Sequence, residues 1–456
     1  MKIGFMSLLV CMLLFTACRK TDEVTTNRDV MLSFSSDTIL FDTVFTAVGS
    51  VNKRIKIFNH DKRSVIISKI QLAAGNNSFF SLIINGLPVS EQTNISVLGQ
   101  DSISIYIKAT INPNNLNQPF IVEDSVLFHT NGNDQAVKLI AYGQNAIFVN
   151  NQTIERNTTW SSTLPYIINK SVTVAEDATL NILPGTRVLF HGNASMSIKG
   201  TLNVQGHGYS PVLFASDRME SFYENEPGQW NGIRFYPGSS NSVINYATLK
   251  NAIIGITADS LTANDSPKLL LTNTIVKNMS IAGFAGYHTT LFAFNNLFYN
   301  SGQYLIYGVG GGAYNLKQNT FAGYTNAFAR RTPAMYFSDL NSARSADLQI
   351  ELKNNIIWGN QTEELLIERK AASIVNTSIT SNIIKTALQS YSSGNFLNVD
   401  PKFLDLNSYN FKVNHMSAAL GKGEDLTADL YYNFLRKDLL GKDRIFPSDL
   451  GCYIYP

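Results

Sequence analysis

The stretch NTIVKNMSIAGFAGYHTTLFAFNNLFYN, residues 273–300, contains one short pattern twice. An asparagine stands on each side of a four-residue run, first at Asn273 and Asn278 and then at Asn295 and Asn300. Related segments occur at 246–251, 318–323 and 355–360, so the first positions of the five segments differ by 27, 22, 23 and 37 residues. A period near 22–23 residues indicates a β-solenoid, in which each repeat is one coil of short strands stacked on the next.

The flanking amides have a structural explanation. Asparagine tolerates the left-handed backbone of a tight turn, and its side-chain amide can hydrogen-bond the asparagine one coil away. A leucine-rich repeat is excluded because the leucine spacing is missing, and a propeller is excluded because the period is too short. We therefore expect residues 146–456 to form roughly 13 coils of ~23 residues each.

Earlier segments of the same region strengthen this expectation: ATLNILPGTRVLF (178–190), GTLNVQG (200–206), PVLFAS (211–216) and WNGIRF (230–235). This succession resembles the right-handed parallel β-helix, or pectate-lyase-like, domains of secreted and surface proteins. The resemblance covers about 300 residues, and it implies the fold but no activity. Trp230 lies in its strand motif, so we expect that side chain in the core.

Residues 31–145 follow a different rule. Short β-rich runs recur at roughly ten-residue spacing, and the alternation of Ile103, Ile105 and Ile107 is typical of a strand with one buried face. Seven or eight such strands predict a β-sandwich. The runs FDTVFTAVGSVNKRIKIFN and DSISIYIKATINP resemble the Ig-like domains that precede β-helices in bacterial surface lipoproteins, which implies a spacer or interaction module.

The first 17 residues are typical of a lipoprotein signal peptide. An apolar run, residues 3–15, is too short to span a bilayer and ends in LFTAC, which resembles a lipobox with Cys18 as the lipid attachment. The alternative is an ordinary signal peptide. Residues 18–30 read as a tether, and its RKTDE resembles a surface-export tag. We therefore predict a lipid anchor in the outer membrane and a protein that faces the cell exterior.

Composition narrows the function further. The net charge is +2, and about +1 without Lys2, which argues against a nucleic-acid partner. Once Cys11 leaves with the signal peptide and Cys18 is lipidated, Cys452 has no partner, so we predict no disulfide. No zinc-type Cys/His spacing and no phosphate-binding glycine loop is present, and we predict no cofactor.

Five Asp-(Ser/Thr)-aliphatic triplets resemble an O-glycosylation sequon of exported proteins in some Gram-negative bacteria. The alternative is that aspartate simply caps turns and strand starts. The candidate O-glycosylation residues are Thr38, Thr43, Ser102, Ser125 and Ser260.

Two segments interrupt the coil pattern, at 216–229 and 323–353. Loops that emerge from a solenoid usually line its binding face, and aromatic rings beside charged groups suit sugars. The candidate glycan-binding residues are Phe222, Tyr223, Arg330, Arg331 and Tyr336. A third segment, 361–370, carries charges spaced as on a short surface helix or turn.

The alternative to binding is a carbohydrate-active enzyme, with a polysaccharide lyase ahead of a glycoside hydrolase. A lyase would need a base such as Arg330 or Arg331 and would hold Ca²⁺ on an acidic cluster, for which Glu220, Glu224 and Glu226 are the candidates. Polygalacturonase-type hydrolases carry Gly-His-Gly, as at His207, but also Asp-Asp and Arg-x-Lys, which residues 146–456 lack.

The leading hypothesis is therefore a non-catalytic surface lipoprotein whose β-helix binds glycan or another cell-envelope macromolecule. A purely structural role is the third possibility. Carboxylates that converge with an Arg or Lys in a groove would favour the enzyme, whereas an exposed aromatic strip without them would favour binding.

Overall fold

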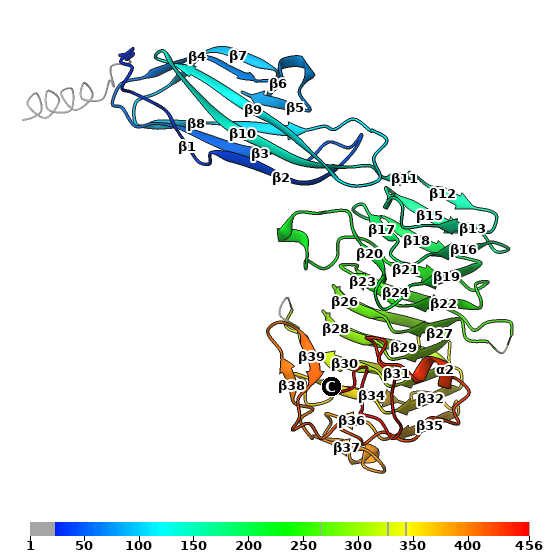
Figure 1. Ribbon diagram of the computed structural model, residues 1–456. Coiled ribbons are helices and arrows are strands. Elements are labelled where there is room, and N and C mark those ends of the chain that lie inside the picture. The colour runs from blue at the N-terminus through cyan, green and yellow to red at the C-terminus, as the bar shows by residue number, and fades with distance from the viewer. Residues whose placement is uncertain (1–22, 265, 326–327, 343, 456) are drawn as a thin grey trace, which may run out of the picture. The chain divides into compact units, whose positions relative to one another are not determined.

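A computed structural model describes residues 23–455, except residues 265, 326, 327 and 343. It divides into two compact units with the boundary between Asn145 and Ala146 (Figure 1). Within the described residues the only α-helix is α2 (Tyr432–Leu435), which confirms the prediction of an all-β chain. Cys18 and the signal peptide lie outside these residues, so the lipid attachment stays a prediction.

The N-terminal unit consists of two five-stranded sheets. One sheet has the order β1 (Ser33–Phe34), β3 (Lys53–Asn59), β8 (Asp101–Ala109), β5 (Phe80–Ile84) and β6 (Leu87–Val89). The other has the order β2 (Thr38–Phe45), β10 (Asn133–Gln144), β9 (Phe120–Thr130), β4 (Val65–Leu72) and β7 (Glu91–Val97). All neighbours are antiparallel except β2 and β10, which are parallel.

Strand alternation builds the core of this unit. Ile105 and Ile107 are fully buried, as the alternating pattern predicts, and Ile103 packs at the edge of the same cluster. Phe128 and Leu139 of the second sheet belong to the same cluster, so the two sheets share one apolar core.

The C-terminal unit contains large parallel sheets, consistent with a β-helix. Its eleven-stranded sheet has the order β11 (Ile147–Val149), β14 (Tyr166–Ile168), β17 (Arg187–Phe190), β20 (Val212–Ser216), β23 (Ala247–Lys250), β26 (Ile275–Met279), β28 (Leu297–Ser301), β30 (Thr320–Gly323), β33 (Ile356–Gly359), β36 (Ile383–Ile384) and β37 (Phe396–Leu397).

A sixteen-stranded sheet forms the rest of the coil as two arms, which β27 and β29 join. The first arm is β12 (Gln152–Ile154), β15 (Ser171–Val174), β18 (Ser195–Ile198), β21 (Ile233–Phe235), β24 (Ile254–Asp259), β27 (Ala282–Phe294), β29 (Tyr304–Lys317), β31 (Met335–Ser338) and β34 (Leu365–Glu368). The second arm is β13 (Thr158–Trp160), β16 (Thr179–Ile182), β19 (Thr201–Gln205), β22 (Ser242–Asn245), β25 (Leu269–Thr272), the later parts of β27 and β29, β32 (Leu348–Lys353) and β35 (Val375–Thr380).

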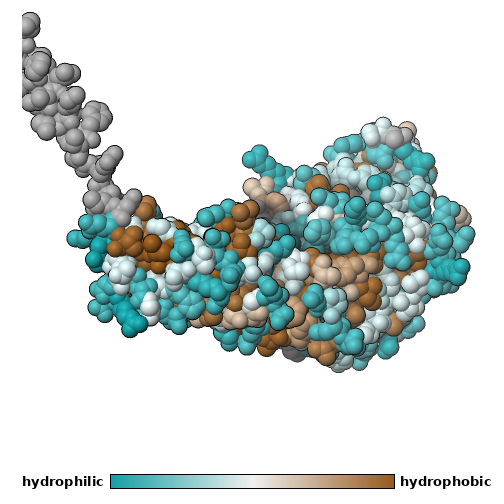
Figure 2. Space-filling view, turned by 90° about the horizontal axis from the view of Figure 1, so that it is seen from above, coloured by the Kyte–Doolittle hydropathy of each residue, from teal (hydrophilic) through white to brown (hydrophobic). Residues whose placement is uncertain are grey.

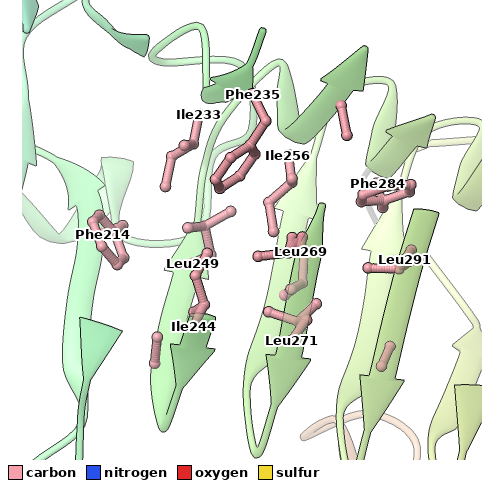
Figure 3. Close-up of a cluster of buried hydrophobic side chains, with 14 of the residues drawn as sticks. Phe214, Ile233, Phe235, Ile244, Leu249, Ile256, Leu269, Leu271, Phe284 and Leu291 are labelled. Atoms are coloured by element: carbon pink, nitrogen blue, oxygen red, sulfur yellow. The ribbon is translucent and has the colours of Figure 1, made fainter. Parts of the chain in front are cut away.

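Inward side chains of successive coils stack in columns inside this unit. Figure 3 shows one such column, in which Ile233, Ile256 and Phe284 follow one another on the first arm. Trp230 is fully buried and stacks on Phe190 at 3.9 Å between ring centroids, which confirms its predicted place in the core.

The predicted amide turns are present. The backbone is left-handed at the start of each repeated segment, at Tyr246, Asn273, Asn295, Gln318 and Asn354. The last of these corrects the sequence alignment, which began that segment one residue later. The strand register gives a spacing of 36 residues there rather than 37, because Thr320 pairs with Ile356.

One residue further along, asparagines form a buried ladder. Asn296 donates its Nδ2 to Asn319 Oδ1 at 3.0 Å, Asn319 does the same to Asn355, and Asn355 to Asn382 at 2.9 Å. The amide–amide bonds predicted between flanking asparagines occur at the second flanking position, where Asn300 donates to Asn278 Oδ1 at 2.8 Å and Asn278 donates to Asn251 Oδ1 at 3.3 Å.

Residues 398–455, here called the strap, leave the coil and run back along it. This segment contains β38 (Phe403–Asp405), β39 (Asn410–Val413) and α2. The left-handed turn residues bind it: Asn295 donates to Phe434 O at 2.6 Å, and Asn354 donates to Glu424 O at 3.0 Å. The strap explains why the eleven-stranded sheet has fewer layers than the roughly 13 coils expected.

Figure 2 shows hydrophilic and intermediate side chains interspersed with apolar patches on the visible face. Among the described residues, no helix has both the length and the apolar character that a membrane crossing requires.

Candidate functional site

The first interrupting segment, 216–229, is a loop between β20 and β21 that contains a 3₁₀ turn, η2 (Ser221–Tyr223). Asn251 donates its Nδ2 to the carbonyls of Tyr223 and Glu224 at 3.1 and 3.0 Å. Asn278 donates to Asn225 Oδ1 at 3.2 Å. The second amide of the repeat therefore fixes this loop, just as the first amide binds the strap.

The structure brings Phe222 and Tyr223 together on this loop. Phe222 is 73% exposed, and its ring meets the ring of Tyr223 edge-on at 5.1 Å. The Arg218 guanidinium covers Tyr223 at 3.8 Å and binds both carboxylate oxygens of Glu220. These two aromatic candidates thus share one patch, which Arg218 organises.

The predicted acidic cluster does not gather around a common point. Glu220 is bound to Arg218, whereas Glu224 and Glu226 are exposed. In the described part of the chain, no group of three or more His, Cys, Asp or Glu side chains is arranged to hold a metal ion. Binding of Ca²⁺ stays a prediction of the lyase alternative alone.

Arg330 is buried rather than presented to a ligand. Its Nη2 forms a 2.7 Å ion pair with Glu364, and the two side chains are 2% and 0% exposed. The pair occupies space that glycines leave open, because a Cβ on Gly323 would lie 2.5 Å from Arg330 Nη2 and one on Gly359 would lie 2.3 Å from Glu364 Oε1. These glycines replace the second asparagine in the last two repeats.

Glu364 corrects the expectation for residues 361–370. The segment is not a surface helix: Glu364 is fully buried, and Leu365–Glu368 form strand β34. The Glu364 carboxylate also accepts the backbone N–H of Ala334 at 2.9 Å and of Gln361 at 2.8 Å. It therefore closes the second interrupting segment onto the coil.

Tyr336 lies on β31, and Arg331 is exposed on the preceding loop. Tyr336 belongs to a row of half-exposed tyrosines on the first arm, which we call the tyrosine strip. Tyr307 and Tyr336 stack at 5.6 Å, Tyr304 lies 4.8 Å from Tyr307, and Tyr287 meets Tyr307 edge-on at 6.4 Å. Sequence reasoning missed Tyr287, Tyr304 and Tyr307, because only the strand register places them side by side.

The same face of the first arm is hollowed further along. A shallow cavity of about 630 Å³ is lined by Thr153, Thr173, Ala175, Glu176, Ser197, Lys199 and Tyr236. Strand register joins the cavity to the strip. One outward column of residues, all at least partly exposed except Ala285 at 2%, passes through Thr153, Thr173, Ser197, Arg234, Thr257, Ala285, Tyr307 and Tyr336.

Charged groups on this face bind one another. Arg234 donates to Asp259 at 2.7 Å, and Lys370 pairs with Glu368 at 2.7 Å. Tyr336 donates its hydroxyl to Glu368 at 2.7 Å. The bonds from Lys370 and Tyr336 lower the pKa of Glu368, and burial raises the pKa of the Tyr307 phenol, so the carboxylate is ionised and the phenol is neutral at pH 7.

A buried lysine fixes the turn that follows Tyr236. Lys268 is fully buried and donates its ammonium to the carbonyls of Tyr236, Pro237 and Ser239 at 3.0, 2.9 and 3.0 Å. Burial lowers the pKa of Lys268 to about 8. The cation thus holds the backbone at one wall of the cavity.

His207 lies on an exposed turn. Its backbone exchanges hydrogen bonds with Ser210 at 3.2 and 2.9 Å. Gly206 is needed beside it, since a Cβ there would lie 1.8 Å from the carbonyl oxygen of Tyr246. The Gly-His-Gly stretch therefore has a structural explanation as a tight turn.

The five candidate O-glycosylation residues are half-exposed: Thr38 and Thr43 on β2, Ser102 on β8, Ser125 on β9 and Ser260 after β24. Asp101 and Asp124 each accept the N–H of the following serine at 2.7 Å, which gives these aspartates a local role. The modification itself stays a prediction.

The chain matches no protein-family model and no curated protein. Among solved structures, it is similar to the catalytic unit of a GH87 α-1,3-glucanase from Streptomyces thermodiastaticus, with 9% identity, a TM-score of 0.26, and coverage of 75% of this chain and 78% of that one. A family 123 glycoside hydrolase from Clostridium perfringens shows 11% identity, a TM-score of 0.19, and coverage of 27% and 30%. A Porphyromonas gingivalis protein of unknown function shows 12% identity, a TM-score of 0.18, and coverage of 27% of this chain and 59% of that one.

The chain therefore spans less than two thirds of the last two proteins. TM-scores this low support no argument about fold or activity.

Proposed function

We propose that this protein is a surface-exposed lipoprotein, in which an Ig-like sandwich precedes a right-handed parallel β-helix that binds glycan without cleaving it. Two features of the C-terminal unit support the β-helix: its parallel stacks and its amide turns. The strong preference for right-handed crossovers between parallel strands supports the handedness. The two antiparallel sheets of the N-terminal unit support the sandwich.

The tyrosine strip is the observation that carries the binding function. Phenol rings combine an apolar body with a hydroxyl, which suits ligands that offer both C–H faces and hydroxyl groups. The cavity on the same face adds the hydroxyls of Thr153, Thr173 and Ser197. Phe222 and Tyr223 form a separate patch, which we keep as a second predicted contact together with Arg331.

The carboxylates on this face support binding over hydrolysis. Strand register separates Asp259 from Glu368 by four strand spacings, or about 19 Å, along a second column that runs through Tyr287, Val309 and Ser338. A pair of hydrolytic carboxylates needs about 5–9.5 Å. Each is also held in an ion pair.

A polysaccharide screen tests the proposal against the enzyme alternative. Purified protein is run through gels that contain soluble neutral or acidic polysaccharides, and the same mixtures are assayed for new reducing ends and for unsaturated ends. Retarded migration without new ends is expected. New ends that form in proportion to protein concentration would replace binding by catalysis.

The anchor has its own test. Cys18→Ser should release the protein from the membrane fraction, because the thiolate is the nucleophile that carries the lipid. Protease treatment of intact cells should digest the wild-type protein if it faces the exterior. Unchanged membrane retention of the variant would contradict the lipid anchor.

A further inference from the structure

We propose that the first arm binds a neutral polysaccharide, extended along the stacking direction of the coils from the cavity to the tyrosine strip. This inference rests on the proposed glycan-binding function and names the ligand class. It follows from the balance of charges on the face, from the partly exposed tyrosine rings with their neutral phenol groups, and from the outward column that connects the cavity to the strip.

Three cations stand against three carboxylates among the residues that line the cavity or form ion pairs beside it and the strip: Lys199, Arg234 and Lys370 against Glu176, Asp259 and Glu368. A polyanion would need a surplus of positive charge, because recognition of charged polymers depends on electrostatic complementarity. A balanced set of charges gives uronate or sulfate groups no net attraction, so this face suits an uncharged polymer.

The four tyrosines of the strip form a row of partly exposed phenol rings. Tyr307 and Tyr336 lie nearly parallel, with 16° between their ring planes, and therefore cover part of one another's faces. All four tyrosines keep part of their surface exposed, with Tyr287 the most exposed at 38%. Neutral phenols donate and accept hydrogen bonds, as sugar hydroxyls do. Such a row can bind a polyhydroxylated chain without any ionic contact.

The outward column sets the direction and length of the site. It runs through eight neighbouring strands, from β12 to β31 in the order β12, β15, β18, β21, β24, β27, β29 and β31. Seven spacings amount to about 34 Å. A single sugar would contact only one or two strands of this site, so the ligand is an extended oligomer or polymer.

Affinity electrophoresis with defined probes tests the proposal. The neutral probes are hydroxyethylcellulose, mannan and soluble β-1,3-glucan, and the acidic probes are polygalacturonate and alginate. We expect retardation by at least one neutral probe, with a dissociation constant that changes less than about twofold between ~0.05 and ~0.5 M salt. Long oligosaccharides should compete at least about tenfold better than the monosaccharide, a difference of about 1.4 kcal/mol.

Substitutions on the strip locate the site. Tyr307→Ala should weaken retardation about tenfold. Tyr307→Phe keeps the ring and should lose less. The matched control is Tyr209→Ala, since Tyr209 is 93% exposed on a turn away from the first arm and should bind as wild type does. Thermal melting of each variant separates lost binding from lost folding.

The outcomes distinguish the two levels of the hypothesis. Retardation by acidic probes alone, with a steep loss in salt, would overturn the neutral ligand and leave the glycan-binding function standing. Neutral binding that survives in Tyr307→Ala with a normal melting temperature would overturn the location. Retardation by none of the five probes would overturn the proposed function itself.

Discussion

The C-terminal unit carries aromatic side chains on two outward surfaces, of which one is covered and the other is partly exposed to solvent. On the eleven-stranded sheet, Tyr299 lies under the strap, where the rings of Tyr409 and Phe411 contact it at 5.0 and 5.2 Å. On the first arm, Tyr307 and Tyr336 stack on one another and stay half-exposed. The strap covers one aromatic surface, and the other stays exposed.

This difference separates structure from function. Rings beneath the strap are part of a hydrophobic cluster with Leu439 and the fully buried Cys452, so their burial contributes to folding. The open rings contribute little burial and are the surface on which we place the ligand. Covered residues should therefore affect stability, and open residues should affect binding.

The largest test of this division compares two glutamates. Glu364→Ala would leave Arg330 buried without its partner, and we expect a loss of about 3–5 kcal/mol in the free energy of unfolding. Glu368→Ala removes an open, solvent-exposed partner of Lys370 and should cost less than about 1 kcal/mol. Urea unfolding of both variants gives the two values. Equal losses would contradict the distinction between covered and open surfaces.

A second comparison uses aromatic side chains alone. Phe411→Ala removes a ring of the strap itself, which is 2% exposed where it packs on Tyr299, and we expect a loss of about 3 kcal/mol from burial and cavity formation. Tyr307→Ala removes an open ring and should cost about 1 kcal/mol through its ring contacts. Denaturant titration measures both. A Phe411→Ala variant as stable as wild type would mean that the strap does not stabilise the coil.

The sequence predicted the covered surface better than the open one. Repeated asparagines predicted the left-handed turns and the amide–amide bonds between flanking asparagines, because each depends on the local backbone and on the next coil alone. The one-residue slip at Asn354 arose where the repeat is lengthened to 36 residues, since a long insertion removes the local register. The strap could not be predicted, because its bonds to Asn295 and Asn354 join residues 70 or more positions apart.

Site prediction failed for a related reason. The repeat pattern places Arg330 in a loop and so predicts a ligand contact, yet the burial of a loop residue depends on what the fold packs against it. Gly323 and Gly359 were the available hint, since glycine at the amide position of the last two repeats leaves room for a side chain from elsewhere. Tyr304 and Tyr307 lie within a long strand, where sequence alone does not show which neighbours flank them.

Lys268 gives a pH-dependent test of the wall beside the open face. Its folded pKa of about 8 lies below the 10.5 of the unfolded lysine. Between these values the unfolded chain binds more protons, so stability rises with pH through this window. We expect the unfolding free energy of wild type minus that of Lys268→Met to increase by ~1–3 kcal/mol from pH 8 to 10.5 and to stay constant below pH 8. A difference that is flat or falls across this range would contradict the shifted pKa.

The smallest expected effect concerns the second open patch. Phe222 in this patch is more exposed than any ring of the tyrosine strip, where the most exposed ring is that of Tyr287 at 38%. Phe222→Ala should leave the unfolding free energy within about 0.5 kcal/mol of wild type, because the ring is 73% exposed. If exposure alone determined binding, this variant would lose more affinity than Tyr307→Ala. We expect the reverse, a loss of about twofold against about tenfold, because Phe222 has no phenol hydroxyl and stands outside the outward column. Arg331→Ala, which changes an exposed loop cation, should behave like Phe222→Ala in the same affinity gels. A larger loss in either loop variant than in Tyr307→Ala would move the principal contact from the first arm to the loops.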